Sequence, residues 1–176
     1  KVTQAFLPYL KPENERPAGR IINIGSISGI IASPFTGAYA ASKHALEGLS
    51  DSLRREMLIY GVEVVLLQPG PIKTDIWRKA KESDNPWLDT AYGPIFRNRD
   101  RVIEKSEESA LPAEDVARLI FRATEKKNPR LRYLIDRNPW KIRLAALLPA
   151  RWLDKMVKKA FQKHLSGDSG AWRGWR

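Results

Sequence analysis

The sequence predicts an α/β fold with a parallel β-sheet, and three observations support this prediction. Residues 20–25 and 62–67 are short apolar runs rich in β-branched side chains, as expected of buried strands. Residues 38–60 between them carry leucines at helical spacing, and Gly61 is suited to end a helix. A strand, a helix and a second strand in succession form a β–α–β unit, whose two strands run parallel.

Two further elements extend this unit. A helix is predicted to begin at Pro112, because proline favours the first helical turn. Its buried face is predicted to consist of Val116, Ile120 and Phe121. Residues 132–136 then predict a third, short strand at the edge of the sheet.

The region after residue 137 predicts two helices, at 140–148 and 151–165, which Pro149 separates. The second helix has an apolar and a basic side, formed respectively by Trp152, Leu153, Met156, Val157, Ala160 and Phe161, and by Arg151, Lys155, Lys158, Lys159 and Lys163. Such a helix either lies on an anionic membrane surface or docks its apolar stripe on the domain or on a second subunit. Residues 167–176 are expected to be disordered.

Composition narrows the class of protein. The net charge is +11, and residues 137–176 account for +8 of it, with ten Lys and Arg against two Asp. The absence of cysteine excludes disulfides and thiolate metal sites and is consistent with a reducing compartment. No apolar run reaches the ~18 residues that a membrane-spanning helix needs. We predict a cytoplasmic protein, which is peripheral to a membrane if the basic tail attaches it. We predict neither a metal site nor a nucleic-acid partner.

Three polar residues suggest a catalytic site. Ser26 follows the first predicted strand, at the carboxyl end where open α/β sheets bind ligands. Tyr39 and Lys43 are four residues apart and so lie one turn apart on one face of the next helix. A free phenol has a pKa of about 10 and exchanges protons poorly at neutral pH, but a neighbouring ammonium group stabilises its ionised form. The three groups together suit proton transfer to or from an alcohol or a carbonyl.

The spacing of Tyr39 and Lys43 alone is weak evidence, because a tyrosine ring often simply packs on the stem of a lysine one turn away. The surrounding sequence is more specific. Ser26 lies in a Gly-Ser-Ile-Ser-Gly turn thirteen residues before Tyr39, which begins the sequence Tyr-Ala-Ala-Ser-Lys. Gln-Pro-Gly-Pro-Ile-Lys-Thr follows at residues 68–74. From about residue 4 to about residue 136, the chain resembles the short-chain dehydrogenase/reductase family.

This resemblance implies a Rossmann-like, doubly wound parallel sheet and an oxidoreductase that uses NAD or NADP. In the family the residues at the positions of Ser26, Tyr39 and Lys43 are catalytic, and the lysine also holds the nicotinamide ribose. A Pro-Gly-x-x-x-Thr segment lies against the nicotinamide. The implied cofactor-binding residues are therefore Tyr39, Lys43, Pro69, Gly70, Ile72 and Thr74.

Residues 75–110 show weak periodicity, with aromatic side chains scattered among charged ones. One interpretation is an irregular surface segment with a few rings tucked onto the core. Because the segment directly follows the Pro-Gly-x-x-x-Thr sequence, we favour a mobile lid over an apolar substrate, which corresponds to the substrate lobe of the family. The candidate lid residues are Trp77, Trp87, Tyr92 and Phe96.

The resemblance also predicts how the chain is organised. The family's glycine-rich phosphate-binding turn is not found in the sequence, so the chain resembles the carboxyl-terminal portion of a longer enzyme. Residues 1–137 are predicted to form that part of the Rossmann domain, and residues 138–176 a basic amphipathic helical tail. We expect the isolated chain to bind no dinucleotide and to be marginally stable, with an exposed sheet edge.

The predicted function is the interconversion of an alcohol and a carbonyl on an apolar substrate of the steroid, retinoid, lipid or hydroxy-acid type. Tyr39 is the expected general acid/base, and the helix at 38–60 is expected to form a homodimer or homotetramer. The alternative is a non-enzymatic remnant that serves dimerisation or peripheral membrane attachment. Neither the substrate nor the preference for NAD or NADP follows from the sequence.

Overall fold

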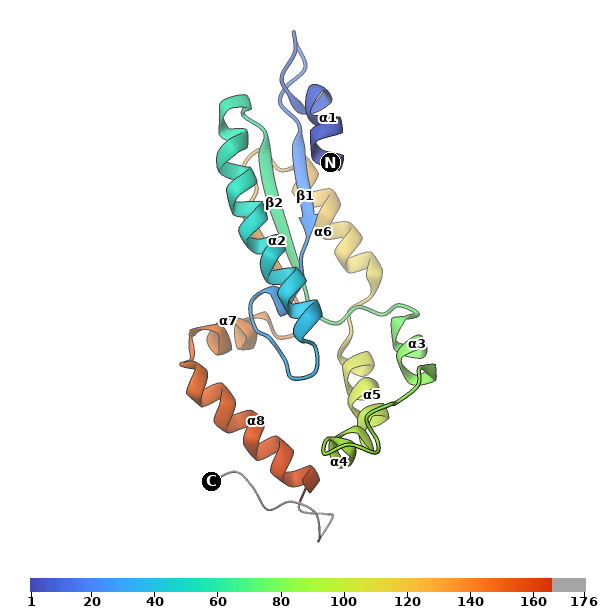
Figure 1. The fold of residues 1–176 in the computed structure, drawn as a ribbon. Helices are drawn as coiled ribbons and strands as arrows, with labels where there is room; N and C mark the ends of the chain where they lie inside the picture. The colour runs from blue at the N-terminus through green and yellow to red at the C-terminus, as the bar shows by residue number, and fades with distance from the viewer. Residues whose placement is uncertain (166–176) are drawn as a thin grey trace.

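A computed structural model describes residues 1–165, arranged around a parallel sheet (Figure 1). The strands β1 (Arg20–Ile24), β2 (Glu63–Pro69) and β3 (Arg132–Ile135) follow one another in the order β1-β2-β3. Both neighbouring pairs are parallel, with Ile24 beside Leu67 in the first. The predicted α/β class with a Rossmann-like parallel sheet is confirmed. The disorder predicted for residues 167–176 lies outside the described residues.

Helices cover the sheet on both faces. The helix α2 (Gly37–Glu56), continued by the 3-10 helix η2 (Met57–Tyr60), lies on one face, and α6 (Ala113–Glu125) lies on the other (Figure 1). The short 3-10 helix η1 (Ile27–Gly29) connects β1 to the loop before α2, and α1 (Val2–Leu10) precedes β1. The arrangement confirms the predicted β–α–β unit.

The segment after β2 and the tail form helices at the end of the sheet where the strands have their carboxyl ends (Figure 1). The segment holds α3 (Ile76–Glu82), α4 (Gly93–Phe96) and α5 (Arg99–Ser109), and the tail holds α7 (Pro139–Leu147) and α8 (Ala150–Leu165). The segment is thus more regular than its weak periodicity predicts. Its helices are short and mostly polar, so they leave little apolar pattern in the sequence. Across residues 1–165 we find no helix of the length and apolar character that crossing a bilayer requires.

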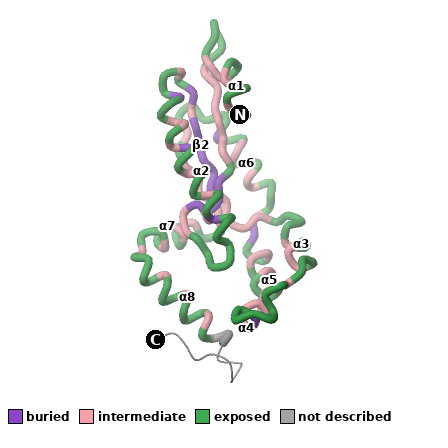
Figure 2. Tube along the Cα trace, in the orientation of Figure 1, coloured by how far each residue is buried: buried purple, intermediate pink, exposed green. Residues whose placement is uncertain are grey.

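The core is centred on β2, which Figure 2 shows as the most buried strand. Its residues Val64, Val65, Leu66 and Leu67 are all buried, as expected where helices cover both faces. At the other end of α2, Gly61 adopts a left-handed conformation with φ of 64° and lets the chain turn into β2. The helix boundary that this glycine predicted is therefore confirmed.

The buried face of α6 differs from the prediction at one position. Val116 and Ile120 are half-buried as expected, but Phe121 is 65% exposed and Ala123 is buried instead. Residues 116, 120 and 123 form one row along a helix, whereas residue 121 lies about 100° further round. The apolar character of Phe121 therefore led to a wrong prediction of the buried face. The small side chain of Ala123 marks where the helix approaches the sheet.

Candidate active site

Ser26 lies just past the carboxyl end of β1. The amide of Gly25 donates a hydrogen bond of 2.7 Å to the carbonyl of Leu67, so the pairing with β2 continues up to the residue before the serine. Ser26 is buried, and its Oγ accepts a hydrogen bond of 3.1 Å from the amide of Ser28 at the start of η1. The hydroxyl is fixed by this bond and keeps its own proton for donation.

Tyr39 and Lys43 are one turn apart near the beginning of α2, as predicted. The Lys43 Nζ lies 5.6 Å from the centroid of the Tyr39 ring, within cation–π distance. The same Nζ donates a hydrogen bond of 3.1 Å to the carbonyl of Ile24, the last residue of β1. The ammonium group therefore connects the tyrosine to the strand end that precedes Ser26. The structure shows no direct hydrogen bond between Ser26 and Tyr39 within residues 1–165.

Close packing between η1 and α2 fixes this arrangement. A Cβ at Gly29 would lie 2.9 Å from the carbonyl oxygen of Lys43, so only glycine lets η1 approach α2 at that point. Further along α2, the buried Ser50 accepts a hydrogen bond of 2.9 Å from the side chain of Asn23 in β1. These contacts set the position of the helix relative to the strand.

Polar contacts also connect α2 to β2 and β3. Glu47 of α2 accepts hydrogen bonds from the buried Gln68 at 2.8 Å and from Arg132 at 2.9 Å. Arg132 also forms an ion pair with Asp51 at 2.9 Å. Burial on its own raises the pKa of Asp51, but the hydrogen bond and charge of Arg132, with the charges of Arg54 and Arg55, hold this pKa below its ordinary value. Burial likewise lowers the pKa of Arg132, and its bonds to Glu47 and Asp51 raise it above the ordinary value.

The Pro69–Thr74 sequence runs from the end of β2 towards α3. Gly70 donates a hydrogen bond of 2.8 Å to the carbonyl of Ile135, and a Cβ at this position would lie 2.0 Å from a carboxylate oxygen of Asp136. The Ile72 carbonyl accepts a hydrogen bond of 2.7 Å from Trp77 Nε1. Within residues 1–165, the amide of Ile72 and the hydroxyl of Thr74 have no hydrogen-bond partner. Both groups are therefore available to a ligand at the carboxyl ends of the strands.

Known proteins resemble this chain in sequence and in fold. The model of the short chain dehydrogenase family matches residues 1–85. An NADPH-dependent 3-dehydrocapnine reductase of Ornithobacterium rhinotracheale is 45% identical over 166 residues, covering 92% of this chain and 58% of the relative. The chain belongs to the short-chain dehydrogenase/reductase family.

Two other proteins extend the comparison. A 3-ketodihydrosphingosine reductase of Bacteroides thetaiotaomicron is 33% identical over 129 residues, which cover 73% of this chain and 47% of that protein. A short chain dehydrogenase/reductase of Burkholderia phymatum, solved in complex with NAD, has 28% identity and a TM-score of 0.60. The match covers 81% of this chain and 51% of that structure. The chain thus spans about 58% of the length of the first curated relatives that it matches.

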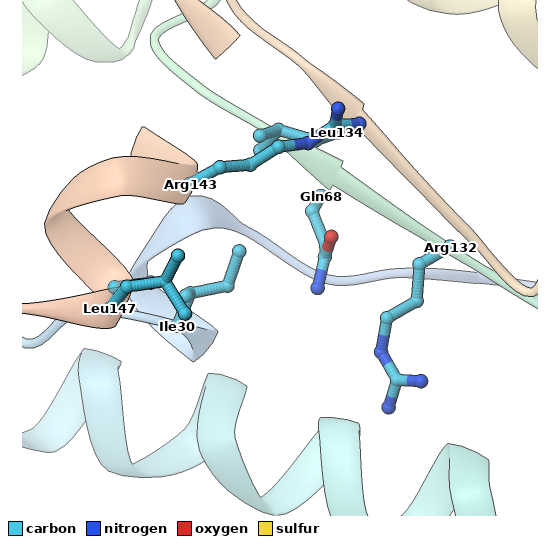
Figure 3. Close-up of a pocket in the computed structure, with 7 residues that line it drawn as sticks. Ile30, Gln68, Arg132, Leu134, Arg143 and Leu147 are labelled. Atoms are coloured by element: carbon cyan, nitrogen blue, oxygen red, sulfur yellow. The ribbon is translucent and has the colours of Figure 1, made fainter. Parts of the chain in front are cut away.

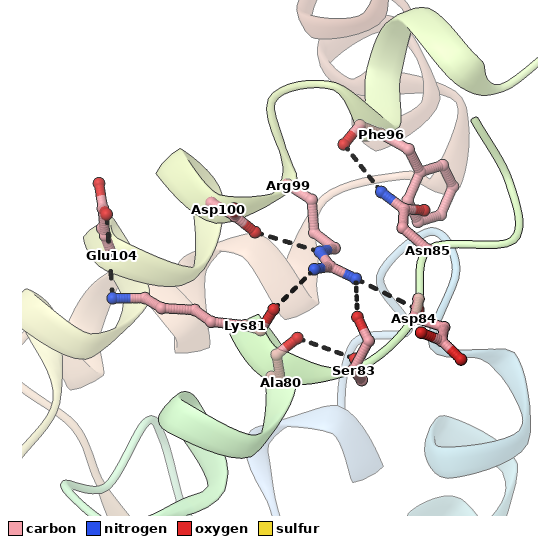
Figure 4. Close-up of polar contacts among 9 residues, drawn as sticks. All are labelled: Ala80, Lys81, Ser83, Asp84, Asn85, Phe96, Arg99, Asp100 and Glu104. Carbon is pink, nitrogen blue, oxygen red and sulfur yellow. Dashed lines mark hydrogen bonds and ion pairs between the residues drawn. The ribbon is translucent and has the colours of Figure 1, made fainter.

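In this short-chain dehydrogenase/reductase chain, the segment predicted as a lid is held together by Arg99 (Figure 4). Its guanidinium donates hydrogen bonds to the carbonyls of Lys81 and Ser83, both at 3.0 Å, and of Asp84 at 3.4 Å. The Lys81 ammonium pairs with Glu107 of α5 at 3.2 Å. The end of α3 is therefore tied to α5 at both ends of that helix.

The structure separates the four predicted lid aromatics into two groups. Trp77 is tied to the Ile72 carbonyl. Tyr92 and Phe96 lie near Phe35 in the loop before α2, and the ring centroid of Trp87 lies 6.3 Å from that of Phe96. The ring centroid of Phe35 is 5.4 Å from that of Tyr92 and 4.9 Å from that of Phe96, and 5.8 Å from that of Phe161 in α8. We name Phe35, Trp87, Tyr92, Phe96 and Phe161 the aromatic cluster.

Sequence reasoning missed Phe35 and Phe161 as neighbours of the lid. Phe35 precedes Tyr39 by four residues and has a φ of 65°, which is strained for an aromatic residue. Neither its position beside Pro34 nor the amphipathic pattern around Phe161 indicates that the two rings meet. The contact shows that α8 docks beside α4 and on the loop before Tyr39.

A cavity of about 350 Å³ lies between β2, β3 and α7, apart from Ser26, Tyr39 and Lys43 (Figure 3). Its lining residues are Ile30, Gln68, Arg132, Leu134, Arg143, Ala146 and Leu147. Figure 3 shows Gln68 and Arg132 extending towards α2, where both bind Glu47. The polar side chains on this side therefore serve the contact between α2 and the sheet.

Proposed function

We propose that this chain provides the proton-transfer residues of an NAD(P)-dependent enzyme that interconverts an alcohol and a carbonyl. The observation that carries the proposal is the position of Lys43, whose ammonium lies over the Tyr39 ring and is held by the Ile24 carbonyl. A positive charge held beside a phenol stabilises the negative charge that develops on its oxygen during proton transfer. Tyr39 is therefore the general acid in reduction and the general base in oxidation.

Each residue has a separate part in the reduction. The Tyr39 hydroxyl gives its proton to the carbonyl oxygen of the substrate while the carbonyl carbon accepts a hydride. The Ser26 hydroxyl donates a hydrogen bond to the same oxygen and orients it, because its Oγ is fixed by the Ser28 amide. Lys43 then stabilises the phenolate that remains until solvent returns the proton. When bound, the nicotinamide cofactor supplies the hydride.

The residues at the carboxyl ends of β1 and β2 fit a nicotinamide cofactor. Ile72 and Thr74 offer an unpaired amide and an unpaired hydroxyl, which suit the donor and acceptor atoms of a carboxamide. Lys43 and Tyr39 offer polar groups for the attached ribose. The name of the 45% identical relative, an NADPH-dependent reductase, supports NADPH as the cofactor of this chain.

The relatives also support a substrate class. Two of them are named for the reduction of 3-dehydrocapnine and of 3-ketodihydrosphingosine, so both names place the oxidised group at carbon 3. The aromatic cluster beside the beginning of α2 offers an apolar surface for the rest of such a molecule. We therefore assign this chain the reduction of a 3-keto compound with an apolar body.

Replacement of Tyr39 by Phe in the intact protein tests the proposal. The variant keeps the ring over which Lys43 lies and removes only the hydroxyl that transfers the proton. We expect reduction of 3-dehydrocapnine with NADPH to fall at least about hundredfold, in the range typical of general acid catalysis, while NADPH binding changes little. Tyr60→Phe, at the opposite end of α2, is the matched control and should keep full activity. Full activity of the Tyr39→Phe enzyme would contradict the proposal.

A further inference from the structure

The tail helices leave two rows of large apolar side chains exposed to solvent. Trp140, Leu144 and Leu147 lie at successive turns of α7, and Leu147 is 82% exposed. Trp152 and Met156 lie one turn apart on α8 and are 61% and 63% exposed. Soluble proteins seldom leave large apolar side chains grouped in this way without a partner.

Docking on the lid does not account for these residues. The side of α8 that faces the protein carries Leu153, Val157 and Phe161, which are half-buried and follow one another at a spacing of four. Trp152 and Met156 lie about 100° round the helix from Leu153 and Val157. The helix α8 therefore carries two apolar stripes, one that packs on the protein and one that is exposed to solvent.

Unpaired positive charges lie next to the exposed stripe. Residues 137–162 contain seven Lys and Arg against one Asp. Lys155 and Lys159, which the sequence pattern assigns to the basic side, are three and seven residues after Trp152 and therefore lie next to it on α8. Neither lysine has an ion pair or a hydrogen bond within residues 1–165. The surface thus offers indole, thioether and ammonium groups together, which is the combination found where helices lie at a lipid–water interface.

We propose that α7 and α8 form a docking surface for an anionic lipid bilayer. Trp140, Leu144, Leu147, Trp152 and Met156 insert at the level of the headgroups, and Lys155 and Lys159 bind the lipid phosphates. A second copy of this chain is a poorer occupant, because it would bring an equally positive surface against the first. A nucleic acid would satisfy the lysines and leave the apolar rows in water. Figure 1 shows α8 beside α4, so the bilayer would lie next to the lid.

Co-sedimentation of the intact protein with vesicles tests this proposal without any measurement of activity. We expect the protein to pellet with vesicles of phosphatidylcholine and phosphatidylglycerol, and much less with phosphatidylcholine alone. Lys155→Gln/Lys159→Gln should weaken binding to the anionic vesicles about thirtyfold, from about 1 kcal/mol for each basic side chain at such a surface. Trp152→Ser/Met156→Ser should weaken binding to anionic vesicles by about tenfold or more.

A matched control is available at the other end of the molecule. Leu58 and Ile59 of η2 are 69% and 77% exposed, so Leu58→Ser/Ile59→Ser removes a similar apolar surface away from the tail. This variant should pellet like the unmodified protein, and circular dichroism should show that every variant is folded. Equal binding by all variants, or no binding to anionic vesicles, overturns the proposal. A different result would be an unmodified protein that binds no vesicles and forms an oligomer that the Trp152→Ser/Met156→Ser variant does not form. That result would assign the surface to a second copy instead.

Discussion

The Nζ of Lys43 donates a hydrogen bond of 3.1 Å to the carbonyl oxygen of Ile24 and lies 5.6 Å from the centroid of the Tyr39 ring. The bond joins α2 to the last residue of β1 and holds a long, flexible side chain in one place. Because the side chain of Lys43 is already ordered, its charge stays beside the phenol, and no conformational entropy is lost in placing it during the reaction. In the function that we propose, Tyr39 is the acid and this lysine supplies the charge that stabilises its phenolate.

Replacement of Lys43 by Met should therefore abolish most of the activity while the fold survives. Met keeps an unbranched aliphatic side chain at residue 43 and removes the ammonium, so the phenolate of Tyr39 loses its stabilising charge. We expect kcat to fall about hundredfold or more. The lost hydrogen bond to Ile24 should cost only about 1 kcal/mol of unfolding free energy. Steady-state kinetics with thermal unfolding separates the two effects. A variant with kcat within threefold of the unmodified enzyme would rule out this role for Lys43.

Gly70→Ala should lower the free energy of unfolding, because the added methyl group would collide with Asp136. The Cβ of Gly70→Ala would lie 2.0 Å from one carboxylate oxygen of Asp136, whose other oxygen accepts a hydrogen bond of 2.7 Å from the amide of Asn138. Movement of the carboxylate breaks that bond, so we expect a loss of about 1 kcal/mol in unfolding free energy by urea denaturation. Asp136→Ala should recover part of the loss when combined with Gly70→Ala.

The matched control for this substitution is Gly48→Ala in the middle of α2. Apart from the adjoining residues and the backbone of α2 itself, no atom of residues 1–165 lies within 4 Å of a Cβ at residue 48, so the new methyl group meets open space. Alanine favours the helix over glycine, and we expect stabilisation by about 0.5–1 kcal/mol. Effects of the same sign for Gly48→Ala and Gly70→Ala would show that the contact with Asp136 is not the cause.

The strands and the helix between them were predictable because their signals are local. β2 is apolar along almost its whole length, and Gly61 marks the end of the preceding helix. The position of Ser26, Tyr39 and Lys43 at one end of the sheet was predictable for the same reason, since their spacing along one β–α unit is fixed. The Ile24 carbonyl as a partner of Lys43 could not be foreseen, because it depends on the distance between helix and strand.

The aromatic cluster was only half predictable. Trp87, Tyr92 and Phe96 are close enough in sequence for one segment to be predicted to hold them. Phe35 and Phe161 are separated by more than a hundred residues, and only the docking of α8 brings their rings to 5.8 Å. Phe121 shows the opposite error, because its side chain is apolar and yet lies in solvent, about 100° round α6 from the buried row. Local pattern thus finds elements, whereas tertiary packing decides which apolar side chains meet.

Replacement of Phe35 by Ala should loosen the lid and the tail together. Phe35 contacts the rings of Tyr92, Phe96 and Phe161, so its removal takes the common partner from α4 and α8. We expect hydrogen exchange in α4 and α8 to accelerate about tenfold, since each lost aromatic pair is worth about 0.5–1.5 kcal/mol. Phe121→Ala, at an exposed site with no ring contact in residues 1–165, is the control and should leave exchange there unchanged. Unchanged exchange in the Phe35 variant would mean that α8 is held without the cluster.

Acid should weaken the contact between α2 and β3 through Asp51. Arg132 holds the pKa of this carboxyl below its ordinary value, which is about 3.9, so the folded chain binds the proton less readily than the unfolded chain. The stabilisation is complete above the ordinary pKa and is lost as the pH falls from there through the folded-state pKa. Asp51→Asn removes the titrating group but keeps its size. The variant should be less stable than the unmodified chain at pH 7, and the difference should shrink between about pH 4 and pH 3.

Urea denaturation at pH 7, 5, 4 and 3 measures this difference directly. Asp89→Asn provides the control, because Asp89 is exposed and its side chain has no partner in residues 1–165. The difference in unfolding free energy between Asp89→Asn and the unmodified chain should stay constant across the whole pH range. Arg132 stays charged throughout, since its bonds to Glu47 and Asp51 raise its pKa, so the change with pH reports on carboxyl groups alone. A constant difference between Asp51→Asn and the unmodified chain from pH 7 to pH 3 would show that the ion pair does not perturb Asp51.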